Sequence, residues 1–498
     1  MIFLYIIACQ QSQKDFSFGI DPTDTATTPD ATDDPPQDPT VEDTAEPGQP
    51  EEPPEPIDVG SLGELRFAMH PGNGSDGFGF RVAGIQDSNG DSLSELALSA
   101  PTYVVPDYNS PSGAVAIYNG REETDDLDAE SMQALLISAG PNEYFGHSIA
   151  SCDFNQDGTT ELFVSAPAHR VGEEPMGALY RYSLPLQGNV STSQAVQTII
   201  GPANGSSFGS AIACDESSGL MAVSAAYFES SLGLTQAGAA WIYEPASAAG
   251  SIESFSIAQF YGDREGQNFG VGMSFGDVNG DSIPDILIGG GGEGLGGTGS
   301  SAVGGFYGPL NDSYFLEDAD VVYRESMEID HLGNTLTCGH DIDGDGYEDC
   351  AISAYWDSSH AERGGAVYLM LGSSEGLTSL QGASARIYGL TDYGYTGISV
   401  SFIDDLNHDG KVDLAIGAYG DKIDAASPEA PGAVHIFTHT PQGISLVSDA
   451  DLTLYGNGGG FGYHVTGLSD ADGDTTSDLL VGAYMEGGGA GYLFSGGE

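Results

Sequence analysis

Basic side chains are scarce in this sequence. Lysine and arginine account for 12 of its 498 residues, against 74 aspartates and glutamates, and the formal net charge at pH 7 is −62. Binding to nucleic acid requires clustered lysines and arginines that neutralise phosphates, so the composition excludes a nucleic-acid partner. The carboxylates either form a solvated acidic surface or bind cations, and their positions along the chain must decide between these two interpretations.

Long apolar runs are also missing. Beyond the first nine residues, MIFLYIIAC, no segment is long and apolar enough to cross a bilayer. This short run resembles the lipobox of bacterial lipoproteins, which implies lipid attachment at Cys9 and a location outside the cytoplasm, at the outer membrane or cell surface of a bacterium. A signal peptide normally has a lysine or arginine before its apolar run, and this sequence has none there. A cytosolic protein with an apolar N-terminus is the alternative.

Residues 10–60 contain almost nothing that a core could bury. They are mainly proline, threonine, aspartate and glutamate, as in DPTDTATTPDATDDPPQDPT. Such a segment cannot offset the entropy of becoming ordered, and it predicts a disordered, extended linker. We therefore expect a lipoprotein-type signal segment at 1–9, a disordered acidic linker at 10–60 and a folded domain at 61–498.

Helical periodicity is essentially absent from the folded domain, which instead repeats itself. Short strands rich in Val, Ile, Tyr and Phe alternate with Gly and Asp, as in FGFRVAGI, ELALSAP and GAVAIYNG. Seven units can be superimposed, and their acidic positions begin at Asp87, Asp153, Asp215, Asp277, Asp341, Asp405 and Asp470. Seven units of four strands predict an all-β fold, a seven-bladed β-propeller of four-stranded antiparallel blades.

The two ends of the domain predict how the ring closes. The last unit stops at AGYLFSGGE, one strand short, whereas a spare strand, ELRFAM, precedes the first unit. We expect this N-terminal strand to complete the last blade. An open, stacked solenoid is the alternative architecture, but it leaves the missing strand unexplained.

Six of the seven acidic clusters share the pattern acid-x-Asn/Asp-x-Asp-x-x-x-acid. Side-chain oxygens at positions 1, 3, 5 and 9, with a backbone carbonyl near position 7, form the oxygen shell that Ca²⁺ prefers, whereas Mg²⁺ demands a stricter octahedron. The expected ligands are Asp87, Asn89, Asp91, Glu95; Asp153, Asn155, Asp157, Glu161; Asp277, Asn279, Asp281, Asp285; Asp341, Asp343, Asp345, Asp349; Asp405, Asn407, Asp409, Asp413; and Asp470, Asp472, Asp474, Asp478.

Other interpretations of these clusters fit less well. Asp, Asn and Gly are also ordinary turn residues, but six turns would not share one spacing at one place in a repeat. An EF-hand is excluded because β-type runs replace its flanking helices and no glutamate stands at position 12. The third unit keeps Asp215 but lacks the later acids, so we expect about six calcium ions and none in the third blade.

Five cysteines leave an even set of four once Cys9 is set apart, which suits an oxidising compartment. Cys338 and Cys350 stand at either end of one expected hairpin, so we predict a disulfide between them. Cys152 and Cys214 each precede the cluster position in adjacent units. They either pair across two blades or remain two buried thiols.

The combination of F-G, an Asp-rich loop and Ala-Pro or Ala-Tyr is similar to the FG-GAP repeat of integrin alpha-chain N-terminal propellers. The F-G element is present in five units, beginning at Phe78, Phe145, Phe208, Phe269 and Phe461. It departs at Leu332-Gly333 and Thr396-Gly397, and the full Gly-Ala-Pro element occurs in no unit. The resemblance implies a seven-bladed propeller with calcium between the first two strands of some blades. Six calcium loops are more than integrin alpha chains usually carry. Together with the lipobox-like N-terminus, this number favours a bacterial relative of the family.

Catalytic patterns are weak. Gly205–Gly209 matches G-x-S-x-G, but it lies in the F-G element of the third unit rather than between a strand and a helix. The ten histidines form no recognisable metal or base cluster. We therefore predict a protein that is not an enzyme, and the alternative is a propeller hydrolase or lyase with its active site in the channel mouth. A lectin would repeat its pocket in every blade, which these rim loops do not.

The loops opposite the acidic clusters offer a binding surface. In integrin-like propellers this face makes the contacts, and here it is rich in aromatic residues. The candidate ligand face comprises Tyr103, Tyr108, His169, Phe228, Tyr355, Trp356, Tyr419 and Tyr484. We predict a monomeric, non-catalytic module for adhesion or recognition, with a protein or carbohydrate partner on this face. The alternative is that these aromatic side chains only cap the blades.

Overall fold

The computed structural model describes residues 63–71, 76–106, 108–202, 206–230, 233–244, 250–291, 301–324, 331–423, 430–457 and 459–497. Contacts divide the chain into two units, Met1–Ile57 and Asp58–Glu498, and all described residues belong to the second. Cys9 and most of the expected linker lie outside the described residues, so the lipid anchor and the domain boundaries stay predictions. No described helix has the length and hydropathy of a membrane-spanning helix.

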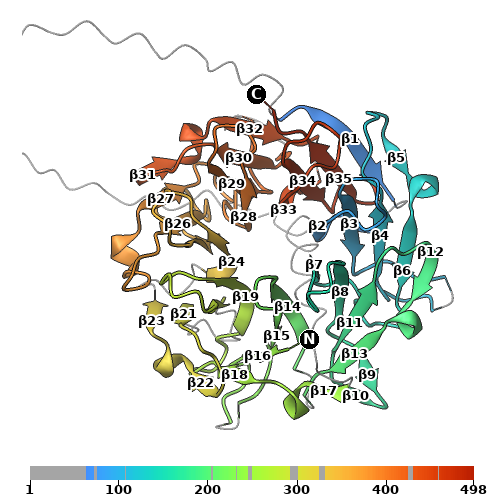
Figure 1. The fold of residues 1–498 in the computed structure, drawn as a ribbon, viewed down its shortest axis with the longest axis horizontal. Coiled ribbons are helices and arrows are strands. Elements are labelled where there is room, and N and C mark those ends of the chain that lie inside the picture. The colour runs from blue at the N-terminus through green and yellow to red at the C-terminus, as the bar shows by residue number, and fades with distance from the viewer. Residues whose placement is uncertain are drawn as a thin grey trace, which may run out of the picture. The chain divides into compact units, whose positions relative to one another are not determined.

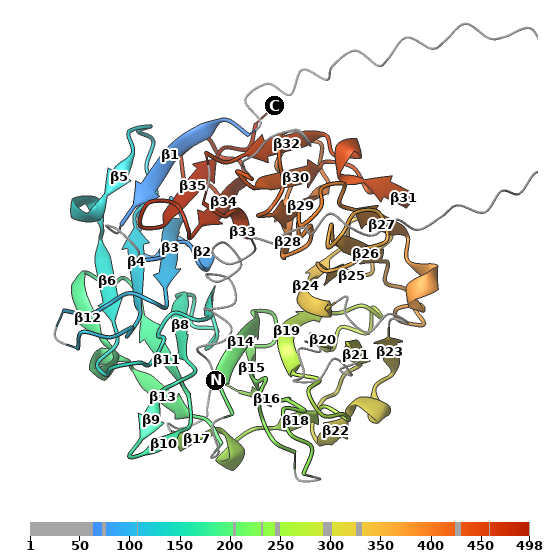
Figure 2. The same ribbon diagram turned by 180° about the vertical axis from the view of Figure 1, so that it is seen from behind.

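The second unit is a seven-bladed β-propeller, which confirms the predicted fold class (Figures 1 and 2). Each blade has four antiparallel strands, ordered from the centre outward, and their bounds follow. Blade 1 contains β2 (Val82–Ile85), β3 (Glu95–Ala100), β4 (Ala114–Tyr118) and β6 (Ala134–Ile137). Blade 2 contains β7 (Ile149–Cys152), β8 (Glu161–Ala166), β11 (Ala178–Ser183) and β13 (Gln197–Ile200). Blade 3 contains β14 (Phe208–Asp215), β15 (Leu220–Ala225), β16 (Ala239–Tyr243) and β18 (Ala258–Tyr261).

The remaining four blades repeat this order. Blade 4 contains β19 (Phe269–Gly276), β20 (Asp285–Gly290), β21 (Ala302–Phe306) and β23 (Val321–Arg324). Blade 5 contains β24 (Leu332–His340), β25 (Asp349–Ala354), β26 (Ala366–Met370) and β27 (Ala385–Tyr388). Blade 6 contains β28 (Ser399–Asp404), β29 (Val412–Ala418), β30 (Ala433–Phe437) and β32 (Leu452–Tyr455). Blade 7 contains β33 (Phe461–Leu468), β34 (Asp478–Ala483), β35 (Ala490–Phe494) and β1 (Leu65–His70).

Blade 7 joins both ends of the domain. Strand β1 pairs antiparallel with β35, with Phe67 opposite Leu493 and Ala68 opposite Tyr492. The N-terminal strand therefore completes the last blade, as the sequence predicted, and Figure 1 shows the blue strand beside the red ones.

Five blades carry a short fifth strand that the sequence analysis missed. It comes from the following repeat and pairs in parallel with the outermost strand, so it links neighbouring blades at the rim. These strands are β5 (Leu127–Asp128), β12 (Gly188–Ser191), β17 (Gly250–Ser251), β22 (Ser313–Phe315) and β31 (Gly443–Leu446). Strands β9 (Arg170–Val171) and β10 (Glu174–Pro175) form a separate ribbon. Single 3₁₀ turns span Ala129–Ser131, Thr192–Gln194, Ile252–Ser254, Leu316–Asp318, Leu380–Gly382 and Val447–Asp449.

The hydrophobic core lies between blades. Each of seven clusters of buried side chains draws on two neighbouring blades; Val367 of blade 5, for example, clusters with Leu414 of blade 6. The second strand of a blade is therefore covered on both faces, and every residue of β3 and β8 is buried. This explains why these strands are continuously apolar rather than alternating.

The F-G element is part of this packing. The side chain of Phe78 is fully buried, and Gly79 adopts φ +86°. A Cβ atom on Gly79 would lie 2.2 Å from the carbonyl oxygen of Ala490, so only glycine allows the two backbones to approach this closely. Leu332 and Thr396, which replace phenylalanine in units five and six, are also buried. The position therefore requires a buried side chain but not an aromatic ring.

Candidate functional site

The six acidic loops occupy equivalent places in the fold. Each joins the innermost strand of a blade to the second strand, and the acid at position 9 stands at or next to the start of the second strand. Strand direction therefore puts all six loops on one face of the propeller. Each loop is wrapped around its own carboxylates. In the fifth loop, Asp341 accepts hydrogen bonds from the backbone N–H groups of Gly344 and Gly346, both at 2.7 Å.

Position 9 is held in the same way in every loop. The backbone N–H of position 2 donates to this carboxylate, as Ile342 does to Asp349 at 2.8 Å and Leu406 does to Asp413 at 2.6 Å. The corresponding bonds occur in loops one, two, four and seven. The carboxylates consequently gather inside the loop. In three loops, three of them bring oxygen atoms within 4.8 Å of one another: Asp87, Asp91, Glu95; Asp341, Asp343, Asp349; and Asp470, Asp472, Asp478.

The buried acids at position 9 carry an electrostatic penalty. Burial, followed by smaller effects that include neighbouring carboxylates, raises the pKa of Asp285, Asp349 and Asp413 to about 7 and that of Asp478 to about 8. Burial likewise raises the pKa values of Glu95 and Glu161. A divalent cation among these oxygens would counteract the penalty, because it favours the charged carboxylate.

The sixth loop offers an independent test of the fit. The Oδ1 atoms of Asp405 and Asp413 are both buried, and neither has a hydrogen-bond partner. Orphaned carboxylate oxygens are costly in a protein interior. Hard oxygen donors without partners are what a calcium site supplies, so the residues fit the cation that the sequence predicts.

Two loops also contact an arginine, which the sequence analysis missed. Arg66 of β1 lies 2.9 Å from Asp472 in the seventh loop, and Arg181 of β11 lies 3.5 Å from Glu161 in the second. Each arginine lies on another strand of the same blade, β1 at the outer side of blade 7 and β11 next to β8 in blade 2, so the signal was in the order of the strands rather than in the loop motif. These side chains offset part of the negative charge in the two loops.

The third loop differs from the other six. Strands β14 and β15 are joined by a tight turn in which Asp215 pairs with Leu220. The Asp215 carboxylate accepts hydrogen bonds from the backbone N–H groups of Ser217 and Ser218, at 3.3 and 3.1 Å. Its charge is thus satisfied within the turn, and the expected absence of calcium there stays a prediction.

Both pairs of cysteines form disulfides. Cys338 and Cys350 face each other in the β24–β25 hairpin, which confirms the predicted bridge. Cys152 and Cys214 join the innermost strands of blades 2 and 3, with Cα atoms 6.6 Å apart. The alternative left open by the sequence is therefore decided in favour of a bridge between blades.

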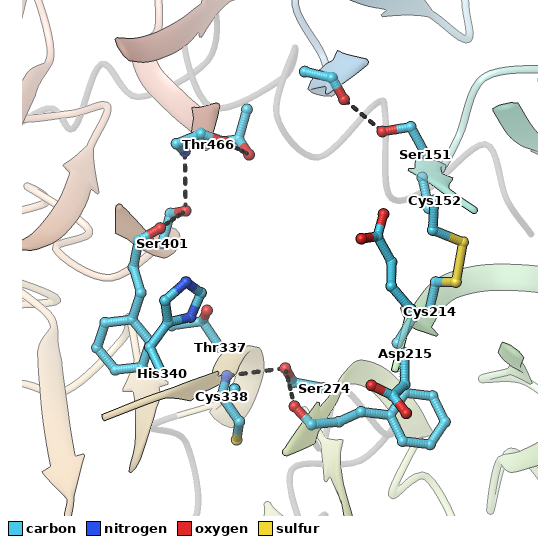
Figure 3. Close-up of a pocket in the computed structure, with 18 of the residues that line it drawn as sticks. Ser151, Cys152, Cys214, Asp215, Ser274, Thr337, Cys338, His340, Ser401 and Thr466 are labelled. Atoms are coloured by element: carbon cyan, nitrogen blue, oxygen red, sulfur yellow. Dashed lines mark hydrogen bonds between the residues drawn. A yellow bond between two sulfur atoms is a disulfide. The ribbon is translucent and has the colours of Figure 1, made fainter. Parts of the chain in front are cut away.

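The innermost strands surround a central cavity of about 1010 Å³ (Figure 3). Its hydroxyl groups bind backbone atoms of neighbouring blades: Ser151 donates to the carbonyl of Gly84, and Ser274 accepts from the N–H of Cys338 at 2.9 Å. Ser401 similarly accepts from Gly467 at 3.2 Å. These serines hold the blades together, and the described lining shows none of them paired with a histidine base.

The expected ligand-face residues fall into two groups. Four join one continuous series of ring contacts, in which Tyr355 and Tyr463 are buried and the other rings are half-buried. We call this series the aromatic arc: Phe80, Tyr484, Tyr463, Tyr419, Tyr395, Tyr355 and Trp356. The rings of Tyr395 and Tyr419 are stacked, with centroids 5.0 Å apart. Phe80, Tyr463 and Tyr395 were missed, although Phe80 and Tyr463 directly follow the F-G pairs of their units.

The other four residues pack locally. Tyr103 lies on Phe78, Phe228 lies on Trp241, and the OH of Tyr108 donates to the carbonyl of Ala139. His169 contacts Glu143 and Tyr180, at 2.9 and 3.1 Å. For these four side chains, the geometry favours the alternative that they cap their blades.

Comparison with known proteins agrees with the geometry. A family model described as FG-GAP repeat matches residues 145–178 and 396–437. The chain is 32% identical over 180 residues to mouse integrin alpha-IIb, 33% over 181 residues to human integrin alpha-7 and 28% over 264 residues to Drosophila melanogaster integrin alpha-PS2. These alignments cover 35%, 34% and 49% of this chain, but only 16%, 14% and 18% of the relatives. The chain therefore contains FG-GAP repeats, and its seven-bladed propeller is similar to the part of integrin alpha chains that it matches.

Proposed function

We propose that this protein is a calcium-stabilised, non-catalytic binding module that uses the aromatic arc to recognise a partner in adhesion or surface recognition. The arc carries the proposal, because a continuous series of aromatic side chains, five of them half-buried, is the kind of surface that anchors protein interfaces. A protein partner is preferred. If a glycan binds to the same rings instead, the partner is a carbohydrate rather than a protein.

Calcium has a structural role in this proposal. The six loops lie on the face opposite the arc, so a cation bound there stiffens the hairpins without touching the partner. The 20 carboxylates of the six motifs, the gathered oxygens and the raised pKa values support it. The two disulfides support a site of action outside the cytoplasm, and lipid attachment at Cys9 stays a prediction.

A pull-down tests the arc. The calcium-loaded propeller is immobilised as the wild type, as the Tyr419→Ala and Trp356→Ala variants, and as a Tyr455→Ala control. Tyr455 is 41% exposed on β32, the outermost of the four antiparallel strands of blade 6, and is not a member of the arc. We expect the two arc variants to lose partners that the wild type and the control retain. Equal capture by all four proteins would contradict the proposal, and a glycan array read with the same proteins identifies a sugar ligand.

A further inference from the structure

Two arginines lie on the aromatic arc. The guanidinium of Arg363 is 4.2 Å from the ring centroid of Trp356 and 5.8 Å from that of Tyr393. At the other end, the guanidinium of Arg81 is 4.9 Å from the ring of Phe80 and 6.0 Å from that of Tyr463. Both side chains are half-buried. Each end of the arc therefore presents a fixed cation rather than a bare ring.

Neither guanidinium has a carboxylate within ion-pair distance among the described residues. Five other arginines do: Arg66 pairs with Asp472, Arg121 with Glu123, Arg181 with Glu161, and both Arg264 and Arg324 with Asp263. Arg170 and Arg386 instead donate to the backbone carbonyls of Glu173 and Gln381. Arg181 also lies over a ring, that of Phe154, but it is ion-paired. Among the described arginines that form no ion pair, Arg81 and Arg363 are the two that lie over aromatic rings, and those rings include members of the arc.

Among the described residues, the groups around the two arginines add no charge that would neutralise them. Glu362, next to Arg363 in sequence, accepts a hydrogen bond from the OH of Tyr393 instead. Burial and the nearby Arg363 lower the pKa of His331 to about 4, and burial and Arg81 lower that of His147 to about 3, so both histidines are neutral at pH 7. Arg81 donates one hydrogen bond, to the carbonyl of Phe80 at 3.3 Å. The other N–H groups of a stacked guanidinium remain able to bind a carboxylate through two parallel hydrogen bonds.

We propose that the arc recognises an acidic segment of a partner protein, with Arg81 and Arg363 as the residues that bind its carboxylates. This inference rests on the proposed function of the arc. A cationic ligand is disfavoured at the two ends of the arc, because the rings of Phe80, Tyr463 and Trp356 already hold guanidinium groups. A second consequence concerns kinetics: the propeller as a whole is strongly negative, so long-range repulsion slows the approach of an acidic partner, and salt screens that repulsion.

Differential selection from a phage library of random linear peptides tests the inference. Peptides are selected on the calcium-loaded wild type and counter-selected on an Arg81→Gln/Arg363→Gln double variant. We expect peptides enriched in Asp and Glu whose affinity falls roughly tenfold or more in the double variant. The control is Arg121→Gln, which removes one positive charge beside the acidic loops. The position is identified by its backbone, because the N–H of Arg121 donates to the carbonyl of Ala471 in the seventh loop. Melting temperatures show that each variant is folded. An Arg81→Lys/Arg363→Lys double variant should retain only part of the wild-type affinity.

Each outcome decides the inference. Peptides enriched in Lys or Arg, peptides insensitive to the double variant, or failure to select any peptide that distinguishes the two proteins would overturn it. Peptides that lose binding to Tyr419→Ala but not to the double variant overturn this inference and leave the proposed function of the arc standing. Peptides insensitive to every arc variant overturn both. For selected peptides, we also expect the association rate to rise with ionic strength, whereas a fall would indicate a basic ligand.

Discussion

At the scale of single residues, the acidic loops show how one side chain can serve two states of the protein. Asp349 is buried, accepts hydrogen bonds from the backbone N–H groups of Ile342 and Gly372, both at 2.8 Å, and has a pKa raised to about 7 by burial. Without a cation it is a strained acid. With one it becomes a ligand, and the same burial then favours binding because water cannot compete.

Replacing one ligand should make stability depend less on calcium. Asp345→Asn removes the carboxylate at position 5 of the fifth loop, so we expect weaker calcium binding and a lower melting temperature in calcium, with little change in chelator. The Asp345 carboxylate accepts the backbone N–H of Tyr347 at 3.0 Å, a bond that the asparagine oxygen can still accept. Calorimetry measures both melts.

Asp215→Asn in the third blade is the matched control for that substitution. It weakens hydrogen bonds within a turn, so it should shift the melting temperature equally with and without calcium. A calcium-dependent shift from Asp215→Asn, or none from Asp345→Asn, would count against the assignment of calcium to these loops.

The acids at position 9 also predict how stability depends on pH. A folded-state pKa of about 7 to 8, far above the ordinary 3.8, means that the folded protein binds more protons than the unfolded chain in this range. The stabilisation is complete below the unfolded pKa and is lost as the pH rises through the folded pKa. In chelator, therefore, the melting temperature should rise when the pH falls from about 8 to about 6.5.

Calcium should reverse the sign of the change in melting temperature with pH. Protons compete with calcium for the same oxygens, so acidification over the same range should lower the melting temperature of the calcium-loaded protein. The window ends at about 6.5 because buried histidines with lowered pKa values, such as His147, destabilise the folded state below that pH. Thermal melts in BAPTA and in calcium give both slopes, and parallel slopes would refute the calcium assignment.

At the scale of strands, neighbouring blades are joined by different bonds around the ring: a disulfide in one place and hydrogen bonds in others. Blades 2 and 3 share the Cys152–Cys214 disulfide, and blades 4 and 5 share the hydrogen bond from Cys338 to Ser274. Blades 7 and 1 share a bond from the N–H of Val82 to Nδ1 of His464 at 3.3 Å. The covalent link thus lies beside the one blade whose loop lacks the calcium pattern.

Removing the bridge between blades should cost more stability than removing the one within a hairpin. The loops closed by Cys152–Cys214 and Cys338–Cys350 span 62 and 12 residues, which correspond to about 4 and about 3 kcal/mol of lost chain entropy in the unfolded state. Denaturant unfolding of the Cys152→Ser/Cys214→Ser and Cys338→Ser/Cys350→Ser variants measures both. A larger loss for the hairpin variant would contradict the entropic argument.

Some of these elements could be predicted from the sequence and others could not. The role of β1 was predictable because a missing strand at one end matched a spare strand at the other. The fifth strands were not, because β12 and β31 are four-residue segments of mostly polar or exposed residues that carry no alternating pattern. Arg66 and Phe80 were missed for a third reason: their partners, Asp472 and Tyr463, are far away in sequence and are brought close only by closure of the ring.

At the scale of the whole molecule, ring closure makes the seven blades one cooperative unit. Strand β1 lies between β35 and β5 and contributes Phe67 and Met69 to the core shared by blades 7 and 1. Deleting residues 63–70 exposes the edge of β35 and removes Arg66 from the seventh loop. We expect the deletion to lower the melting temperature by many degrees and to promote association through the open edge. Light scattering and calorimetry measure these effects, and an unchanged, monomeric propeller would show that closure adds little.

Closure by β1 also sets an order of events during synthesis. Strand β1 leaves the ribosome before the other described strands, whereas its antiparallel partner, β35, is made after all of them. Until then an apolar segment, LRFAM, has no sheet to join, and contacts between such distant parts of a chain form slowly. The nascent protein therefore carries an exposed, aggregation-prone strand until β35 has been made, and its yield should depend on chaperones that shield this segment until then.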